Sequence, residues 1–245
     1  MVGARIRDQR QSAAAPESAE CAALAGVYRL LGRLLEEELD AATLELLRGE
    51  LRGALVAAGI DPGADFWEAA PGQLLEELAE EYTALLVAPG ACRPLASVAL
   101  TGMMMQDPAN RAEQAYAQAG WAYRERLSGE FADHLGTMLC FVGELAAAEA
   151  AALKAGDGEA VSWRERRASF LVEELGPWAP GFCRRARAAA LHPFYGAVLG
   201  AVEQLLWSEL ARLVDRRHLR DLRDENHREP PRLDYDADFR KASGL

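Results

Sequence analysis

The chain has 245 residues, a formal net charge of -11 at pH 7 and a pI near 5.0. This acidic balance argues against a nucleic-acid partner, because phosphate backbones are bound by clustered Lys and Arg. Half of the residues are hydrophobic and only 7% are aromatic, which argues against disorder of the whole chain and allows a core built from aliphatic helix faces.

Apolar residues recur along most of the chain at three- and four-residue spacing, which is typical of helices with one buried face. Ser18 is the expected N-cap of the first of them. A short turn or helix is expected around residues 65–67. The longer predicted helices cover residues 18–39, 41–58, 71–88, 97–105, 108–127, 131–154, 162–175, 177–190 and 192–214.

Glycine and proline mark the expected ends of these helices. The Gly59-Ile60-Asp61-Pro62-Gly63 cluster ends the second helix. Pro89-Gly90 ends the third, and Pro94 keeps the following segment irregular, because proline fixes φ and lacks a backbone N–H. No sustained alternation of β-branched residues with hairpin turns occurs, so the sequence predicts an all-α fold of about ten helices.

The two ends of the chain differ in composition from its middle. Residues 1–17 are predicted to be a flexible extension, residues 18–215 one helical domain, and residues 216–245 a charged, mobile tail. No repeat of fixed period and no Gly/Ser/Pro-rich linker interrupts the central part. One domain is therefore the simpler prediction.

Three features bear on the compartment. The four cysteines are far apart and form no C-x-x-C pair, which is typical of cysteines that act as buried small hydrophobic residues. Arginines near the start are not followed by an apolar stretch, so a secretory signal is not indicated. No window approaches the roughly 20 uninterrupted apolar residues of a membrane span. We expect a cytoplasmic protein without stable membrane insertion.

Glu130, Asp133 and His134 form the only tight cluster of acids and imidazole in the sequence. Two interpretations are open. In the first, Glu130 or Asp133 caps the following helix and His134 hydrogen-bonds locally. In the second, the three residues are the site of a helical metal-dependent hydrolase, although adjacent residues on a helix point about 100° apart and no His-x-x-x-His pattern adds a ligand.

The region before this cluster has a second possible role. Tyr82, Leu85 and Leu86 share the apolar side of a helix that carries many carboxylates, and a proline-containing loop and Ser97 follow. Periodicity alone favours an ordinary core face with a solvated acidic face. The alternative is a groove for a basic, apolar peptide.

Three stretches resemble the TorD/DmsD/NarJ family of assembly chaperones for molybdenum-containing oxidoreductases. The first runs from Glu81 to Gly90 with Pro94 and Ser97, and is similar to the family's aromatic-x-x-Leu-Phe, Gly/Pro loop and Ser. The second is the segment 130–135. The third comprises Phe170 to Leu175, Pro177-Trp178 and the His192-Pro193-Phe194-Tyr195 sequence.

The resemblance extends over about residues 20–210 and has two departures. Leu86 stands where Phe is common, and Phe131 and Ala132 stand where the family usually has a proline beside Asp-His. These differences bear on peptide affinity and client choice. The N-terminal extension and the charged tail fall outside the matched part.

The resemblance implies a single helical domain, monomeric or in a domain-swapped dimer, that binds the twin-arginine signal or another N-terminal segment of a catalytic subunit. It implies no catalytic residue, no metal and no cofactor of its own. A basic, apolar signal would complement an acidic chain with an apolar groove. The peptide-binding residues it implies are Tyr82, Leu85, Leu86, Pro89, Pro94, Ser97, Glu130, Asp133 and His134.

Two alternatives from other classes remain at this point. A hydrolase that uses Glu130, Asp133 and His134 would hold stoichiometric metal after purification. A helical DNA-binding regulator would need a basic recognition helix, which this acidic chain does not clearly show.

Overall fold

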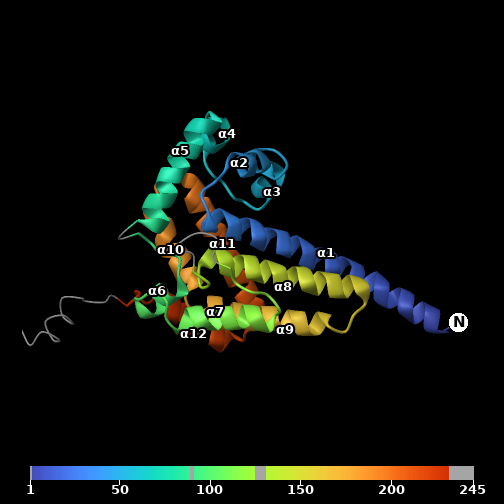
Figure 1. The fold of residues 1–245 in the computed structure, drawn as a ribbon. Helices are drawn as coiled ribbons and strands as arrows, with labels where there is room; N and C mark the ends of the chain where they lie inside the picture. The colour runs from blue at the N-terminus through green and yellow to red at the C-terminus, as the bar shows by residue number, and fades with distance from the viewer. Residues whose placement is uncertain (1, 89–90, 125–130, 232–245) are drawn as a thin grey trace, which may run out of the picture.

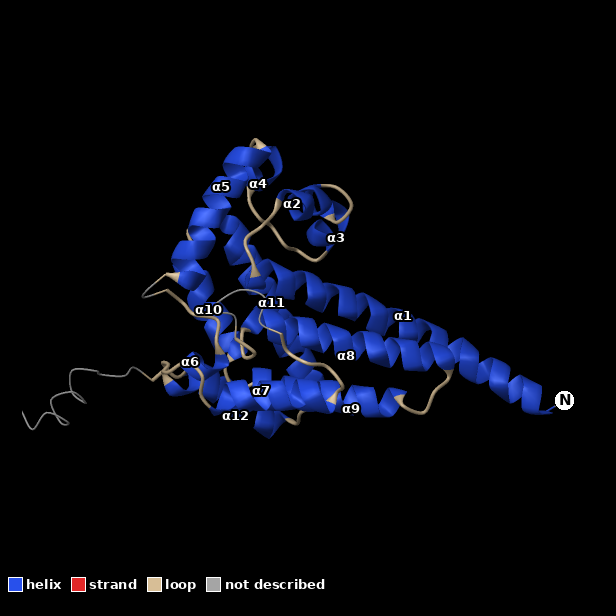
Figure 2. Ribbon diagram, in the orientation of Figure 1, coloured by secondary structure: helices blue, strands red, loops and turns tan. Residues whose placement is uncertain are grey.

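The computed structural model describes residues 2–88, 91–124 and 131–231. Within these ranges it has twelve α-helices, two π-helical segments and no β-strand, which confirms the predicted all-α fold (Figures 1 and 2). The elements are α1 (Val2–Glu36), α2 (Ala41–Arg48), α3 (Arg52–Ala57), α4 (Ala64–Glu68), α5 (Pro71–Tyr82), η1 (Thr83–Val87), α6 (Ala96–Thr101), α7 (Asp107–Gln118), α8 (Leu135–Ala155), α9 (Ala160–Phe170), η2 (Leu171–Leu175), α10 (Ala179–Ala189), α11 (Pro193–Leu213) and α12 (Arg216–His227).

The long helices α1 and α8 lie side by side in opposite directions and form the spine of the molecule (Figure 1). The Ser18 hydroxyl donates to the carbonyl of Ala150 near one end, at 2.8 Å. The Thr137 hydroxyl donates to the Glu36 carboxylate near the other end, also at 2.8 Å. Polar contacts thus fix the relative register of the two helices at both ends.

Glycines allow the two helices to approach closely. A Cβ atom on Gly32 would lie 2.6 Å from the Cys140 sulfur and 2.7 Å from the Gly136 carbonyl oxygen. A Cβ on Gly136 would in turn lie 2.7 Å from the Gly32 carbonyl oxygen. Any side chain at either position would force the backbones apart, since backbone atoms cannot move aside as a flexible side chain can.

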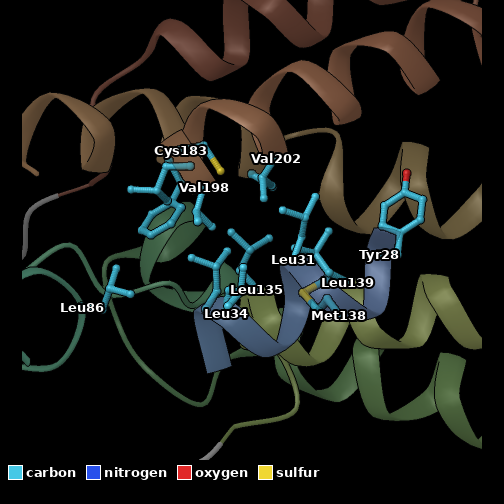
Figure 3. Packing of buried hydrophobic residues seen from close by; sticks show 14 of the residues in the cluster. Tyr28, Leu31, Leu34, Leu86, Leu135, Met138, Leu139, Cys183, Val198 and Val202 are labelled. Atoms are coloured by element: carbon cyan, nitrogen blue, oxygen red, sulfur yellow. The ribbon is translucent and has the colours of Figure 1, made fainter. Parts of the chain in front are cut away.

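The core is built on this helix pair. Leu31 of α1, Met138 of α8 and Val202 of α11 converge in its centre, as Figure 3 shows. Cys183 of α10 is buried at the same cluster. The core is mainly aliphatic, as the composition predicts, and burial of such side chains is the main favourable contribution to folding.

A buried ion-pair network joins α8, α9 and α11. The Arg167 guanidinium donates to the carboxylate of Glu149 at 3.1 Å and to that of Glu209 at 3.0 Å. Arg164 donates to the other oxygen of Glu149 at 2.6 Å. Glu149 is fully buried, so it needs these partners, because an unpaired buried charge is strongly destabilising.

One helix among the described residues, α8, is long and apolar enough to cross a membrane. However, 67% of its apolar window is buried inside the protein. Core helices of soluble proteins meet the same criteria of length and composition, so α8 is only weak evidence for a membrane span. The expected lack of stable membrane insertion stays a prediction.

The structure corrects the secondary structure that was predicted for both ends of the chain. Helix α1 begins at Val2, so Ser18 lies inside a helix and is not its N-cap. Helix α12 occupies 216–227, where an irregular tail was expected. Its Leu222 is buried and its Asn226 is 2% exposed, so α12 is docked on the core. The abundance of charge misled the prediction, because one apolar stripe suffices to anchor a helix.

Several helix boundaries also differ from the prediction. The segment 41–58 contains two helices, α2 and α3, because the chain turns at Gly49. Helix α8 begins at Leu135 and not at 131. The last turns of two predicted helices, 71–88 and 162–175, are not α-helical. They form η1 and η2, which have π-helical hydrogen bonds of the kind that is common near functional sites.

We expect Gly32→Ala to destabilise the protein by about 1–3 kcal/mol, because the added methyl group overlaps backbone atoms of α8. Chemical denaturation followed by circular dichroism would measure the change. Gly26→Ala in the same helix is the matched control, since a Cβ there meets nothing within 4 Å. The control should be neutral or slightly stabilising. Equal stability of the two variants would contradict the close approach.

We expect Asn226→Ala to cost about 1–3 kcal/mol, because the side-chain oxygen of Asn226 accepts from Gly181 N at 2.6 Å and its nitrogen donates to Gly176 O at 2.7 Å. Denaturation of Asp224→Ala, an exposed change in the same helix, gives the baseline. If both variants matched wild type, α12 would not be docked as described.

Candidate functional site

Two loop segments that are far apart in the sequence meet in front of α8. Leu95 and His134 form an isolated antiparallel bridge. The backbone N–H of Leu135 donates to the carbonyl of Pro94 at 2.8 Å, and that of Ala96 donates to the carbonyl of Asp133 at 3.0 Å. The structure therefore brings together four of the predicted site residues: Pro94, Ser97, Asp133 and His134.

The Asp133 carboxylate caps a helix that it does not belong to. Its Oδ2 atom accepts from Ser97 N in the first turn of α6, at 2.7 Å. Leu95, at the N-cap position of α6, has no side-chain acceptor. Asp133 is fully buried, and its Oδ1 atom has no hydrogen-bond partner among the described residues. The residue that was predicted to start one helix thus stabilises the start of another.

His134 occupies the N-cap position of α8. Its Nδ1 atom accepts from Gly136 N at 3.1 Å. His192 repeats the arrangement at α11, where Nδ1 accepts from Phe194 N at 3.1 Å. The prediction that Glu130 or Asp133 caps α8 was therefore wrong for Asp133, since the histidine itself is the cap. Glu130 lies outside the described residues.

Tyrosine hydroxyls fix this region to the rest of the protein. The Tyr82 hydroxyl donates to the carbonyls of Leu35 and Glu36 at the end of α1, at 3.2 and 2.9 Å. Burial, with the nearby Glu38 carboxylate as a further cause, raises the pKa of Tyr82 to about 12. The Tyr116 hydroxyl donates to the Ala132 carbonyl at 2.6 Å, and burial raises its pKa well above the usual value. Both hydroxyls remain donors at neutral pH.

Leu85 and Leu86 lie in η1 and are 6% and 3% exposed. The backbone N–H of Cys92 donates to the Leu85 carbonyl at 2.9 Å, so the chain folds back over η1. Pro89 lies outside the described residues. Figure 3 shows Leu86 at the edge of the core cluster. These leucines have the core role that periodicity alone favours.

The seven predicted peptide-binding residues that the structure describes do not line an open groove. Tyr82, Ser97 and Asp133 are buried, as are Pro94 and both leucines of η1. His134 alone among the described members is partly exposed. Their visible role is to shape the junction of α1, η1, α6 and α8. Their contact with a peptide stays a prediction.

An open hollow of about 570 Å³ lies along the exposed side of α5 and η1. One wall is the outward face of α5 and η1, formed by Glu77, Glu80, Glu81 and Ala84. The start of α4 and the turn before α11 form the other walls, and their lining residues are Pro62, Gly63, Ala64, Asp65, Leu191, His192 and Pro193.

A hydrogen-bonded carboxylate holds two walls of this acidic hollow together. Glu81 Oε1 accepts from the backbone N–H groups of Leu191 and His192, at 2.7 and 3.3 Å. Glu81 precedes Tyr82, so the inner and outer sides of α5 are fixed by adjacent residues. The glutamates and the His192-Pro193 pair are both evident in the sequence, but their proximity is not, because the contact spans more than 100 residues.

The spacing of three glutamates is the signal of this face in the sequence. Glu77, Glu80 and Glu81, with Ala84 in η1, follow the i, i+3, i+4, i+7 pattern of one helix face. That face adjoins the apolar face with Leu74 and Leu78. This spacing identifies an acidic helix face, but it does not show that α4 and the turn before α11 lie opposite that face.

The hydrolase alternative requires that Asp133 and His134 direct their side chains to one metal ion. Asp133 and His134 direct their acceptors to different helices, α6 and α8. Among residues 2–88, 91–124 and 131–231, no group of three His, Cys, Asp or Glu side chains could hold a metal ion. The geometry therefore gives the hydrolase alternative no support within that part of the chain.

The family described as "Nitrate reductase delta subunit" matches residues 34–184 of the sequence. The chain belongs to this family. It is a family of maturation chaperones for molybdenum enzymes, as the three resembling stretches imply. No curated protein matches the sequence.

The matched part of this nitrate reductase delta family member includes every predicted peptide-binding residue and the whole acidic face of α5. The turn at Leu191, His192 and Pro193 lies beyond it. The bridge between Leu95 and His134 joins two of the three stretches on which the resemblance to the family rests.

We expect Asp133→Ala to destabilise the protein by about 1–3 kcal/mol, because it leaves the buried N–H of Ser97 without an acceptor. Asp133→Asn keeps a side-chain oxygen that can accept from Ser97 N, so it should lose less stability than Asp133→Ala. Urea denaturation of the two variants would measure both effects. A stability of Asp133→Ala equal to wild type would show that the cap contributes nothing.

Proposed function

We propose that this protein is a system-specific assembly chaperone. It binds the N-terminal segment, or the twin-arginine signal, of the catalytic subunit of a molybdenum-containing oxidoreductase in the cytoplasm. It holds that subunit until the molybdenum cofactor is inserted, and thereby delays export. The observation that carries the proposal is the family match over residues 34–184.

Three properties of the chain support this function. The net charge of -11 suits a basic partner segment. The hollow at α5 offers carboxylates on an accessible surface. The π-helical η1 and the bridged loop after it lie within the signature stretches, where a local change of backbone hydrogen bonding could expose Leu85 and Leu86 to an apolar segment.

Affinity capture from the native cell tests the partner. We expect the wild-type chain, carrying a C-terminal tag, to co-purify with the catalytic subunit of a molybdenum oxidoreductase, which mass spectrometry would identify. A client from which the N-terminal segment has been deleted should escape capture. Equal capture of the truncated client would contradict binding through that segment.

The predicted residues can be tested by calorimetric titration with the captured client's N-terminal segment. Asp133→Ala and Leu85→Ala should weaken binding, provided that circular dichroism shows both variants to be folded. Both side chains are buried, so their loss can also affect folding. Gly26→Ala is the folded control, because a Cβ at that position meets nothing within 4 Å. Unchanged affinity in both variants would exclude them from the binding site.

Cofactor insertion has a separate readout. The client purified from cells that lack this chain should contain less molybdenum per protein than the client from wild-type cells, because the empty subunit is no longer held for loading. Elemental analysis measures the ratio. Full molybdenum occupancy without the chain would contradict the role in insertion and leave the binding result intact.

A further inference from the structure

The acidic hollow at α5 has no cationic Lys or Arg side chain among the residues that line it. Four carboxylates line it, from Asp65, Glu77, Glu80 and Glu81. No ion pair among the described residues involves any of these four. Elsewhere carboxylates such as Glu144, Glu149 and Glu174 are each paired with arginine.

Contacts between the wall segments fix the shape of the hollow and the positions of its carboxylates. Glu81 ties α5 to the turn before α11 through two backbone N–H groups. Gly63, with a φ of 90°, packs against Pro193, which a Cβ atom would approach to 3.1 Å. The three walls are therefore held together by contacts within the protein, and the hollow is preorganised for a ligand.

An apolar side chain stands at the rim of the hollow. Leu191 is 89% exposed, the highest value among the exposed large hydrophobic residues of the described chain. It borders the same hollow as Glu77 and Glu80. An unpaired set of carboxylates next to an exposed leucine complements a segment with cationic residues followed by apolar ones.

We propose that the arginines or lysines at the start of the client's N-terminal segment bind in the hollow between α4, α5 and the turn at 191–193, with the following apolar residues against Leu191. This inference rests on the proposed chaperone function and assigns the cationic part of the segment to a surface separate from the buried Asp133 and His134 junction. Guanidinium groups suit the hollow because they can donate to two carboxylates at once.

The test is a fluorescence-anisotropy titration with the labelled N-terminal segment of the captured client, at low and at moderate salt. The variant Glu77→Lys/Glu80→Lys should bind it at least about tenfold more weakly than wild type, because attraction becomes repulsion. The control Asp221→Lys/Asp224→Lys changes the net charge equally, on exposed positions of α12. It should bind within about twofold of wild type and share its salt dependence.

A charge-swapped peptide separates charge complementarity from a structural effect. With the segment's basic residues replaced by glutamate, binding to wild type should fall and binding to Glu77→Lys/Glu80→Lys should recover. Wild-type affinity of the Glu77→Lys/Glu80→Lys variant would overturn the inference while leaving the chaperone function in place. Failure of wild type to bind the segment or to capture any client would overturn both.

The chain also carries arginines of its own near the start, at positions 5, 7 and 10. Light scattering after size exclusion tests whether these occupy the hollow of a second copy. We expect wild type and Glu77→Lys/Glu80→Lys to have the same mass. A dimer that the double variant abolishes would overturn client docking and assign the hollow to self-association.

Discussion

The close approach of α1 and α8 is the constraint on which the rest of the structure depends. Gly32 and Gly136 place the backbones of the two helices in direct contact, and neither position can hold a side chain. The end of α1 then lies beside the start of α8. The Tyr82 hydroxyl and the first turn of α8, through Thr137, are both hydrogen-bonded to the end of α1 at this point.

The positions of the predicted site residues around Asp133 and His134 depend on this contact. The loop before α8 pairs with the loop before α6 through Leu95 and His134, and Asp133 can then cap α6. Tyr116 supports the same loop from α7 through the Ala132 carbonyl. Each of these bonds satisfies a backbone group that would otherwise be buried without a partner, which is why polar residues are needed in an apolar setting.

The two sides of α5 have different physical roles. The inner side joins the core through Leu74, Leu78 and Tyr82, and the buried signature residues continue it. The outer side offers unpaired carboxylates to solvent around a hollow. Because Glu81 and Tyr82 are consecutive, the hydrogen bonds of α5 to the turn before α11 and to the end of α1 come from neighbouring positions.

The sequence by itself determined the all-α class and the membership of an assembly-chaperone family, and it singled out Tyr82, Asp133 and His134 as candidates, because periodicity and local motifs are properties of neighbouring residues. Only the tertiary structure decided what these residues contact. Asp133 caps a helix 36 positions earlier, α12 docks through Asn226 despite its charge, and Glu81 meets Leu191 across the fold. Such contacts depend on how helices pack, and packing is set by the glycine contact between α1 and α8, which no local pattern reveals.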